Sequence, residues 1–136
     1  MSGTEAKKII NLYELENARK MFFLIRDIRE EIESTYYYYK SPDLMRIGSG
    51  SGTNPAADPT AAAFRQIEEL SEAYEDILSG FLEYQSECLK RIPDPMISAL
   101  VQLHYFSGIE WKNTGTPRAR ARVAEYISAH AEELNR

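Results

Sequence analysis

The chain has 136 residues, enough for one domain with a modest hydrophobic core. Its 43% hydrophobic and 27% charged residues are typical of a folded globular protein and exclude wholesale disorder. The formal net charge of −5 excludes a protein that is basic overall and coats nucleic acid non-specifically, although it is compatible with a local basic site.

Cysteine usage and hydropathy indicate the compartment. The single cysteine, Cys88, can form neither an intramolecular disulfide nor a thiolate metal site, which is consistent with a reducing cytoplasm. The N-terminal sequence MSGTEAKKII lacks the apolar run of a signal peptide, and no stretch approaches the roughly 18 apolar residues of a membrane span. We expect a cytoplasmic protein that makes no membrane contact.

Residues 4–38 are expected to form the first long helix, because apolar residues recur at helical spacing along them. The recurring positions are Ala18, Met21, Ile25, Ile28 and Ile32. The following segment 41–58, SPDLMRIGSGSGTNPAAD, is rich in Gly, Ser and Pro and is expected to be a flexible exposed connection.

Residues 59–91 are expected to form the second long helix. Asp58 is a suitable N-cap and Pro59 suits the first helical position, while Pro93 and Pro95 end the helix. Its heptad seam consists of Ala63, Ile67, Leu70, Tyr74, Ile77, Phe81, Tyr84 and Cys88. An all-α fold follows, in which the two long helices form an antiparallel hairpin within a first domain, residues 1–93.

Residues 94–136 are expected to form a small C-terminal helical unit. Asp94 caps a helix that starts at Pro95, and Gly108 ends it in the left-handed conformation. The apolar stripe of this helix is Ile97, Leu100, Val101 and His104.

A last helix is expected from Thr116 and Pro117, as N-cap and first helical residue, to about Leu134. Between these helices Trp111 should face inward. The apolar face of the last helix would consist of Val123, Ile127, Ala131 and Leu134.

Residues that could support catalysis are few. His104 and His130 lie on different helices without acidic or cysteine neighbours at metal-ligand spacing, and Cys88 lies on the heptad seam as a small hydrophobic residue. The GSGSG segment follows no strand and lacks the lysine of a phosphate-binding loop. We therefore expect neither an enzyme nor a bound metal or cofactor.

The segment TPRARARVAEY carries the one local cluster of positive charge. Arginines in the first turns of a helix oppose its dipole, and a bound phosphate would relieve that conflict. Arg118 and Arg122 share a face, whereas Arg120 projects to roughly the opposite side. Ordinary ion pairing of Arg122 with Glu125 is the alternative interpretation.

The order of features resembles small bacteriophage-encoded transcriptional regulators of the RinA/ArpU type, whose C-terminal ends are similar to the DNA-binding region four of sigma factors. The resemblance spans residues 46 to about 111, and its most telling piece is LVQLHYFSGIEW. It implies a helix-turn-helix motif whose second helix enters the major groove of DNA. By position, the motif core would be Trp111, His104, Tyr105 and Gly108. The DNA contacts would come from Arg118, Arg120, Arg122 and Lys112.

Two positions depart from the family pattern. His104 stands where the family usually has arginine, and WKNTG reaches its glycine about four residues early, a loss of about one helical turn. The first helix of the motif is therefore expected to be a stub.

These observations lead to two functional hypotheses. The first is a phage or prophage regulator, in the cytoplasm of the bacterial host, that binds DNA or contacts RNA polymerase or another phage protein. The second is a helical interaction protein without DNA binding, whose acidic hairpin and tyrosine-rich tip, Tyr36–Tyr39, bind a partner or a second copy of the chain. Exposed heptad positions on the hairpin would favour a homodimer.

Overall fold

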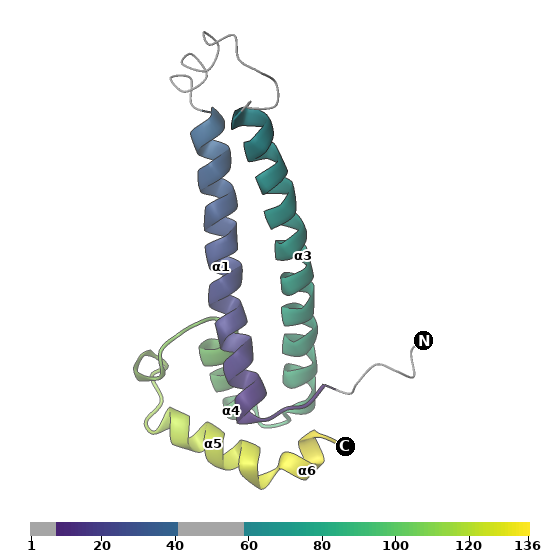
Figure 1. The fold of residues 1–136 in the computed structure, drawn as a ribbon. Helices are drawn as coiled ribbons and strands as arrows, with labels where there is room; N and C mark the ends of the chain where they lie inside the picture. The colour runs from purple at the N-terminus through teal and green to yellow at the C-terminus, as the bar shows by residue number, and fades with distance from the viewer. Residues whose placement is uncertain (1–7, 41–58) are drawn as a thin grey trace, which may run out of the picture. The chain divides into compact units, whose positions relative to one another are not determined.

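The computed structural model describes residues 8–40 and 59–136, in which all regular structure is helical (Figure 1). Two long helices, α1 (Leu12–Lys40) and α3 (Pro59–Arg91), run antiparallel and side by side. The predicted all-α fold with a helical hairpin is thus confirmed. The predicted connection 41–58, with the cap Asp58, lies outside the described residues.

Five shorter helical segments follow α3. They are α4 (Pro95–Val101), the π-helix η3 (Gln102–Phe106), the 3-10 helix η4 (Trp111–Asn113), α5 (Ala119–Ala129) and α6 (Ala131–Leu134). The chain groups into two compact units: Met1–Phe23 with Ser79–Arg136, called here the terminal unit, and Leu24–Leu78, called the middle unit. The predicted division into 1–93 and 94–136 stays a prediction.

The first helix begins at Leu12, so its predicted start at residue 4 is wrong for residues 8–11. Asn11 ends the non-helical segment by capping α1, because its Oδ1 atom accepts a hydrogen bond of 2.7 Å from the backbone N–H of Glu14. The three residues before Asn11 are not helical, and other parts of the terminal unit bind their backbone.

Hydrogen bonds hold that N-terminal segment. The side chain of Asn135 accepts from the N–H of Ile10 at 2.6 Å and donates to its carbonyl oxygen at 2.9 Å. Arg91 donates to the carbonyl oxygen of Lys8 at 2.7 Å, and the Tyr84 hydroxyl donates to that of Ile9 at 2.7 Å. These bonds satisfy backbone groups that a helix would otherwise have paired.

The second long helix spans the predicted residues 59–91. Every member of its predicted seam is buried or half-buried. Cys88 is fully buried, and burial raises the pKa of its thiol to about 12. The prediction that it packs as a small hydrophobic residue is confirmed.

Aromatic rings join the elements of the terminal unit. Phe81 of α3 lies 6.4 Å from Phe22 of α1 and 5.5 Å from Phe106 of η3, measured between ring centroids. Tyr84 lies 6.1 Å from Phe106. Such pairs add to the burial of large apolar surfaces and hold the three helices together.

The helix from Pro95 starts as predicted and then changes type. The Asp94 carboxylate accepts hydrogen bonds from the N–H groups of Met96 and Ile97, at 2.9 and 3.2 Å, as a helix cap. The predicted stripe is buried. From Gln102 the segment is a π-helix, in which the three consecutive residues 104–106 are all buried.

The last predicted helix is shorter and broken. Arg118, with φ 56°, precedes a helix that begins at Ala119 and not at Pro117. His130, with φ −112° and ψ 17°, interrupts the helix before α6. As a result Leu134 is buried as predicted, whereas Ala131 is exposed, contrary to the prediction.

Gly108 should tolerate no side chain. Its φ of +73° is left-handed, and an added Cβ atom would lie 2.5 Å from Cε1 of Phe22. Gly108→Ala should therefore lower the free energy of unfolding by about 2–4 kcal/mol, measured by urea denaturation, from combined backbone strain and overpacking.

Gly115→Ala is the matched control for this substitution. Gly115 has φ +75°, but an added Cβ would meet nothing within 4 Å. It should cost about 1 kcal/mol from backbone strain alone. Equal losses in the two variants would contradict the close packing of Gly108 against Phe22.

Candidate nucleic-acid interface

The corner after η3 positions the candidate site. The chain reverses at Gly108, where the N–H of Ile109 donates to the carbonyl oxygen of Leu103 at 2.9 Å. Arg19 of α1 donates through Nε to the carbonyl oxygen of His104 at 3.2 Å and through Nη2 to that of Gly108 at 3.4 Å. A guanidinium thus satisfies carbonyl groups at the end of the helix, where a positive charge is favoured.

His104 holds Trp111 in place by ring stacking. The two rings are 3.7 Å apart with an interplanar angle of 15°, and Tyr105 contacts the same indole edge-on at 5.5 Å. Nδ1 of His104 lies 2.7 Å from the carbonyl oxygen of Ile109. The four residues assigned to the motif core, Trp111, His104, Tyr105 and Gly108, therefore lie at one corner of the chain.

Burial gives His104 a defined protonation state. Removal from water lowers its pKa from 6.5, and this effect outweighs the hydrogen bond to Ile109, which acts in the opposite direction. The neutral ring must carry its proton on Nδ1, since the carbonyl oxygen of Ile109 can only accept. His104 is thus a neutral stacking partner for Trp111.

The helix expected after Trp111 is one turn of 3-10 helix, Trp111–Asn113, so the predicted stub is observed. The Thr114 hydroxyl donates to the carbonyl oxygen of Trp111 at 2.8 Å and closes this turn. The chain then passes through Gly115, which is left-handed, before α5 begins. A full helix of four or more residues is absent between η3 and α5, all of which the structure describes.

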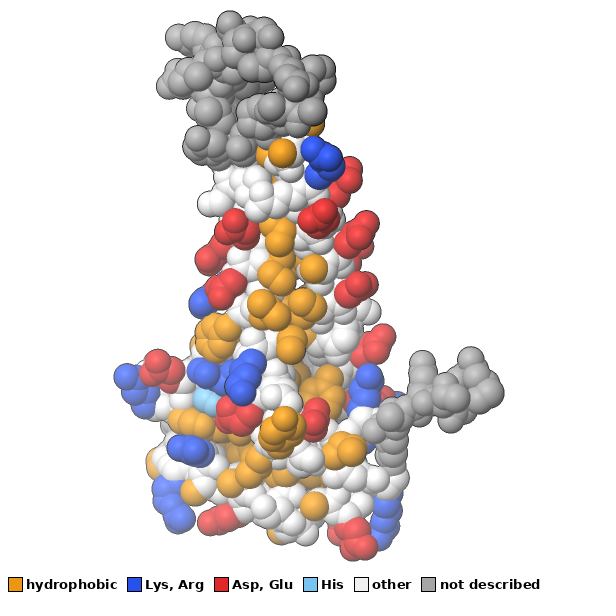
Figure 2. Space-filling model, in the orientation of Figure 1, with side chains coloured by type: hydrophobic (Ala, Val, Ile, Leu, Met, Phe, Trp, Pro, Cys, Tyr) orange, Lys and Arg blue, Asp and Glu red, His pale blue; other side chains and the backbone are white. Residues whose placement is uncertain are grey.

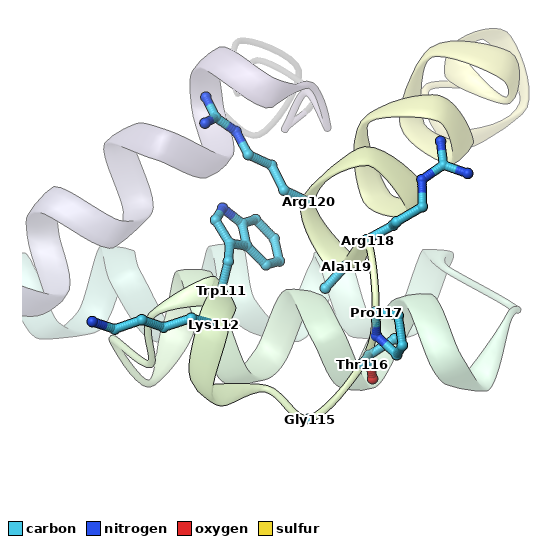
Figure 3. A pocket seen from close by; sticks show the side chains of 8 residues that line it. All are labelled: Trp111, Lys112, Gly115, Thr116, Pro117, Arg118, Ala119 and Arg120. Atoms are coloured by element: carbon cyan, nitrogen blue, oxygen red, sulfur yellow. The ribbon is translucent and has the colours of Figure 1, made fainter.

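A pocket of about 460 Å³ lies between this turn and the start of α5 (Figure 3). Its lining consists of Trp111, Lys112, Gly115, Thr116, Pro117, Arg118, Ala119 and Arg120. Three of the four predicted DNA contacts thus border one pocket. In Figure 3 the side chains of Arg118 and Arg120 extend in different directions from α5, and the indole of Trp111 lies on the side of Arg120.

The cations of the pocket are exposed and weakly paired. Lys112 lies 3.3 Å from Glu110, and Arg118 lies 3.8 Å from Glu125, with more than half of each side chain in solvent. Such exposed ion pairs contribute little free energy, so a polyanion can displace them. Within the described ranges Arg120, also exposed, forms no ion pair.

Arg122, the fourth predicted contact, does not line the pocket. Its Nη1 atom lies 3.2 Å from the sulfur of Met96, and its side chain is exposed. It therefore adds a positive charge near the start of α5 but does not line the pocket.

Arg118 adopts a backbone conformation that disfavours its own side chain. It is the one residue other than glycine with positive φ among residues 8–40 and 59–136, and a left-handed conformation costs a non-glycine residue about 1 kcal/mol or more. Arginine rarely adopts the left-handed conformation, so the sequence around Arg118 does not predict it. Strain of this kind is often kept where a side chain serves a function.

The tyrosine-rich end of α1 belongs to the middle unit. Tyr36 and Tyr37 are exposed, at 47% and 80%, whereas the side chains of Tyr38 and Tyr39 lie outside the described residues.

Within the described residues no cluster of three or more His, Cys, Asp or Glu side chains is arranged to hold a metal ion. No helix among them is long and apolar enough to cross a membrane.

Comparison of the chain with protein-family models, with curated proteins and with solved structures finds no match. The site is therefore defined by its geometry. Sequence reasoning named the pocket cations and Trp111, but it missed Arg19, which lies 85 residues before His104 and has no local signal.

The lowered pKa of His104 predicts a loss of stability in mild acid. Below about pH 6.5 the unfolded chain binds a proton that the folded chain excludes, so the free energy of unfolding falls as the pH decreases through this range. Urea denaturation at about pH 7.5 and about pH 5.5 should show a smaller decrease for His104→Gln than for the unaltered chain. Identical decreases in the two proteins would refute the assignment.

Relief of strain at Arg118 should stabilise the fold. Arg118→Gly should raise the free energy of unfolding by about 0.5–1 kcal/mol, because glycine adopts positive φ readily. Arg118→Ala removes the same side chain without relieving the strain and should not stabilise the protein. A gain with alanine equal to that with glycine would mean that the side chain, and not the backbone, is the source of the strain.

Proposed function

We propose that the protein is a DNA-binding regulatory protein, of the phage transcriptional type, which contacts the phosphate backbone through the start of α5 and the preceding turn. The observation that carries the proposal is that Lys112, Arg118 and Arg120 all border one open pocket. Lysine and arginine side chains that contact phosphates provide most of the sequence-independent affinity for DNA.

The distribution of charge along the chain supports this location. Residues 94–136 carry five acidic and five basic residues, so the whole net charge of −5 resides in residues 1–93. Four of the five basic residues lie between Lys112 and Arg122, where Glu110 and Glu125 are the acids that pair with them. DNA would therefore approach this part of the chain with the least electrostatic repulsion.

The retained strain at Arg118 is a second line of support. Glycine would adopt the same backbone conformation at lower cost, yet the position, which lines the pocket, carries a long cation. A phosphate bound there would compensate for part of that cost through a charge-assisted hydrogen bond. The single turn η4 is too short to act as the first helix of an ordinary helix-turn-helix, so we propose contacts to the backbone and not to base edges.

The test is the salt dependence of DNA binding. The full chain is titrated into a fluorescein-labelled mixed-sequence duplex of about 30 base pairs, in salt from about 50 to 200 mM, and binding is followed by anisotropy. Each phosphate contact contributes about 0.9 to the slope of log affinity against log salt, so Lys112→Gln/Arg118→Gln/Arg120→Gln should reduce the slope by about 2–3.

The matched control removes three exposed cations elsewhere. Lys20→Gln/Arg65→Gln/Lys90→Gln changes the net charge by the same amount but leaves the pocket intact. Its salt slope should stay near that of the unaltered chain. The proposal fails if the two triple variants lose the same slope, or if the unaltered chain does not bind the duplex at the lowest salt.

A further inference from the structure

The described part of the middle unit consists of two helical segments, which are too few to enclose a hydrophobic core. Among its described residues only Ile25 and Ala63 are buried, although both helices carry apolar residues at heptad spacing. The seam residues Ile28, Ile32, Ile67, Leu70, Tyr74 and Ile77 are all half-buried. Two helices contact each other only along their seams. On either side of this contact lies a flank, meaning the surface formed by the adjoining faces of both helices, and it stays exposed to solvent unless another element covers it.

One flank of this helix pair is apolar along its middle. On α1, Leu24 and Ile28 are four residues apart, on one side of Ile25, and Leu24 is 40% exposed. On α3, Ala73 and Ile77 occupy the corresponding side of the seam, also four residues apart. Figure 2 shows a band of hydrophobic side chains along this part of the molecule.

Acidic side chains border the band on both sides (Figure 2). Helical spacing places Glu31 next to Ile28 on α1, and Glu69 and Asp76 next to Ala73 on α3. All three carboxylates are exposed, and in the described part of the chain none of them forms an ion pair. The opposite flank differs, because Arg26 and Arg29 lie on it and pair with acids of α1.

The charge of the middle unit, together with the acidic borders of this flank, indicates which partner would bind there. The two helical segments of the middle unit, 24–40 and 59–78, carry nine acidic and four basic residues. A second copy of the chain would bring two acidic borders together, which is unfavourable. A helix with an apolar stripe and lysine or arginine on either side of it would cover the band and neutralise the borders.

We propose that this flank, bounded by Glu31 on α1 and by Glu69 and Asp76 on α3, binds a basic amphipathic helix of a partner protein. The partner helix lies along Leu24, Ile28, Ala73 and Ile77 and completes a three-helix bundle. This partner site is separate from the proposed DNA contacts and does not depend on them.

The experiment measures binding of a synthetic helix to the full chain. The probe is a fluorescein-labelled peptide of about 20 residues, with leucine at the a and d positions of its heptads and lysine at e and g. The matched peptide has glutamate in place of lysine. The lysine peptide should bind in an anisotropy titration, and the affinity should fall as salt increases, whereas the glutamate peptide should not bind.

Two charge variants locate the site. Glu31→Gln/Glu69→Gln/Asp76→Asn should weaken binding of the lysine peptide about tenfold, as expected for three exposed ion pairs. Glu33→Gln/Glu68→Gln/Glu75→Gln removes the same charge from the opposite flank, where helical spacing puts these residues, and should bind the peptide like the unaltered chain. Glutamine and asparagine on exposed helix faces change stability little, and circular dichroism verifies the helical content of both variants.

The proposal is overturned by equal loss of binding in the two variants, by equal binding of the two peptides, or by no binding of the lysine peptide. It is also overturned if light scattering shows a dimer that Leu24→Gln dissociates, since a second copy of the chain would then occupy the flank. The salt slope of DNA binding by Glu31→Gln/Glu69→Gln/Asp76→Asn should stay near that of the unaltered chain, because none of these residues lines the pocket of Figure 3.

Discussion

The contact of Gly108 with Phe22 and Phe23 is the constraint on which the terminal unit depends. The backbone of the corner approaches α1 so closely that a single methyl group would overlap a phenylalanine ring. Arg19 adds hydrogen bonds to the same corner and lies 4.9 Å above the ring of Phe23. This fixed corner holds His104 against Trp111, which is itself one of the residues that line the pocket.

The two proposed binding sites differ in charge. The acidic residues concentrate before residue 94, and the exposed cations of the C-terminal part gather at the start of α5. A polyanion and a basic helix would therefore be attracted to different parts of the molecule. The two proposed partners have opposite charge, and each would be repelled from the site of the other. Such a chain could hold a nucleic acid and a protein at once without competition between them.

Local rules predicted α3 well because its evidence is local: a proline at its start, prolines after its end and an unbroken apolar seam. The cap Asn11, three residues before Glu14, is a local signal that sequence analysis overlooked. The π-helix and the left-handed Arg118 have no such signal in the residues around them. The sequence predicted the pocket cations from their residue types. That Arg122 does not line the pocket could be seen only once the structure showed that α5 begins at Ala119.

The pairing of Asn135 with Ile10 joins residues that are 125 positions apart. During synthesis on a ribosome, the segment around Ile10 emerges long before its partner exists. The helices α1 and α3 can meet while the chain grows, and Arg91 and Tyr84 can then bind the backbone of Lys8 and Ile9, but Ile10 stays without its two bonds until residue 135 has been added. The bonds to Ile10 therefore form only after the two long helices have been made, and a chain that lacks residue 135 would lack both bonds.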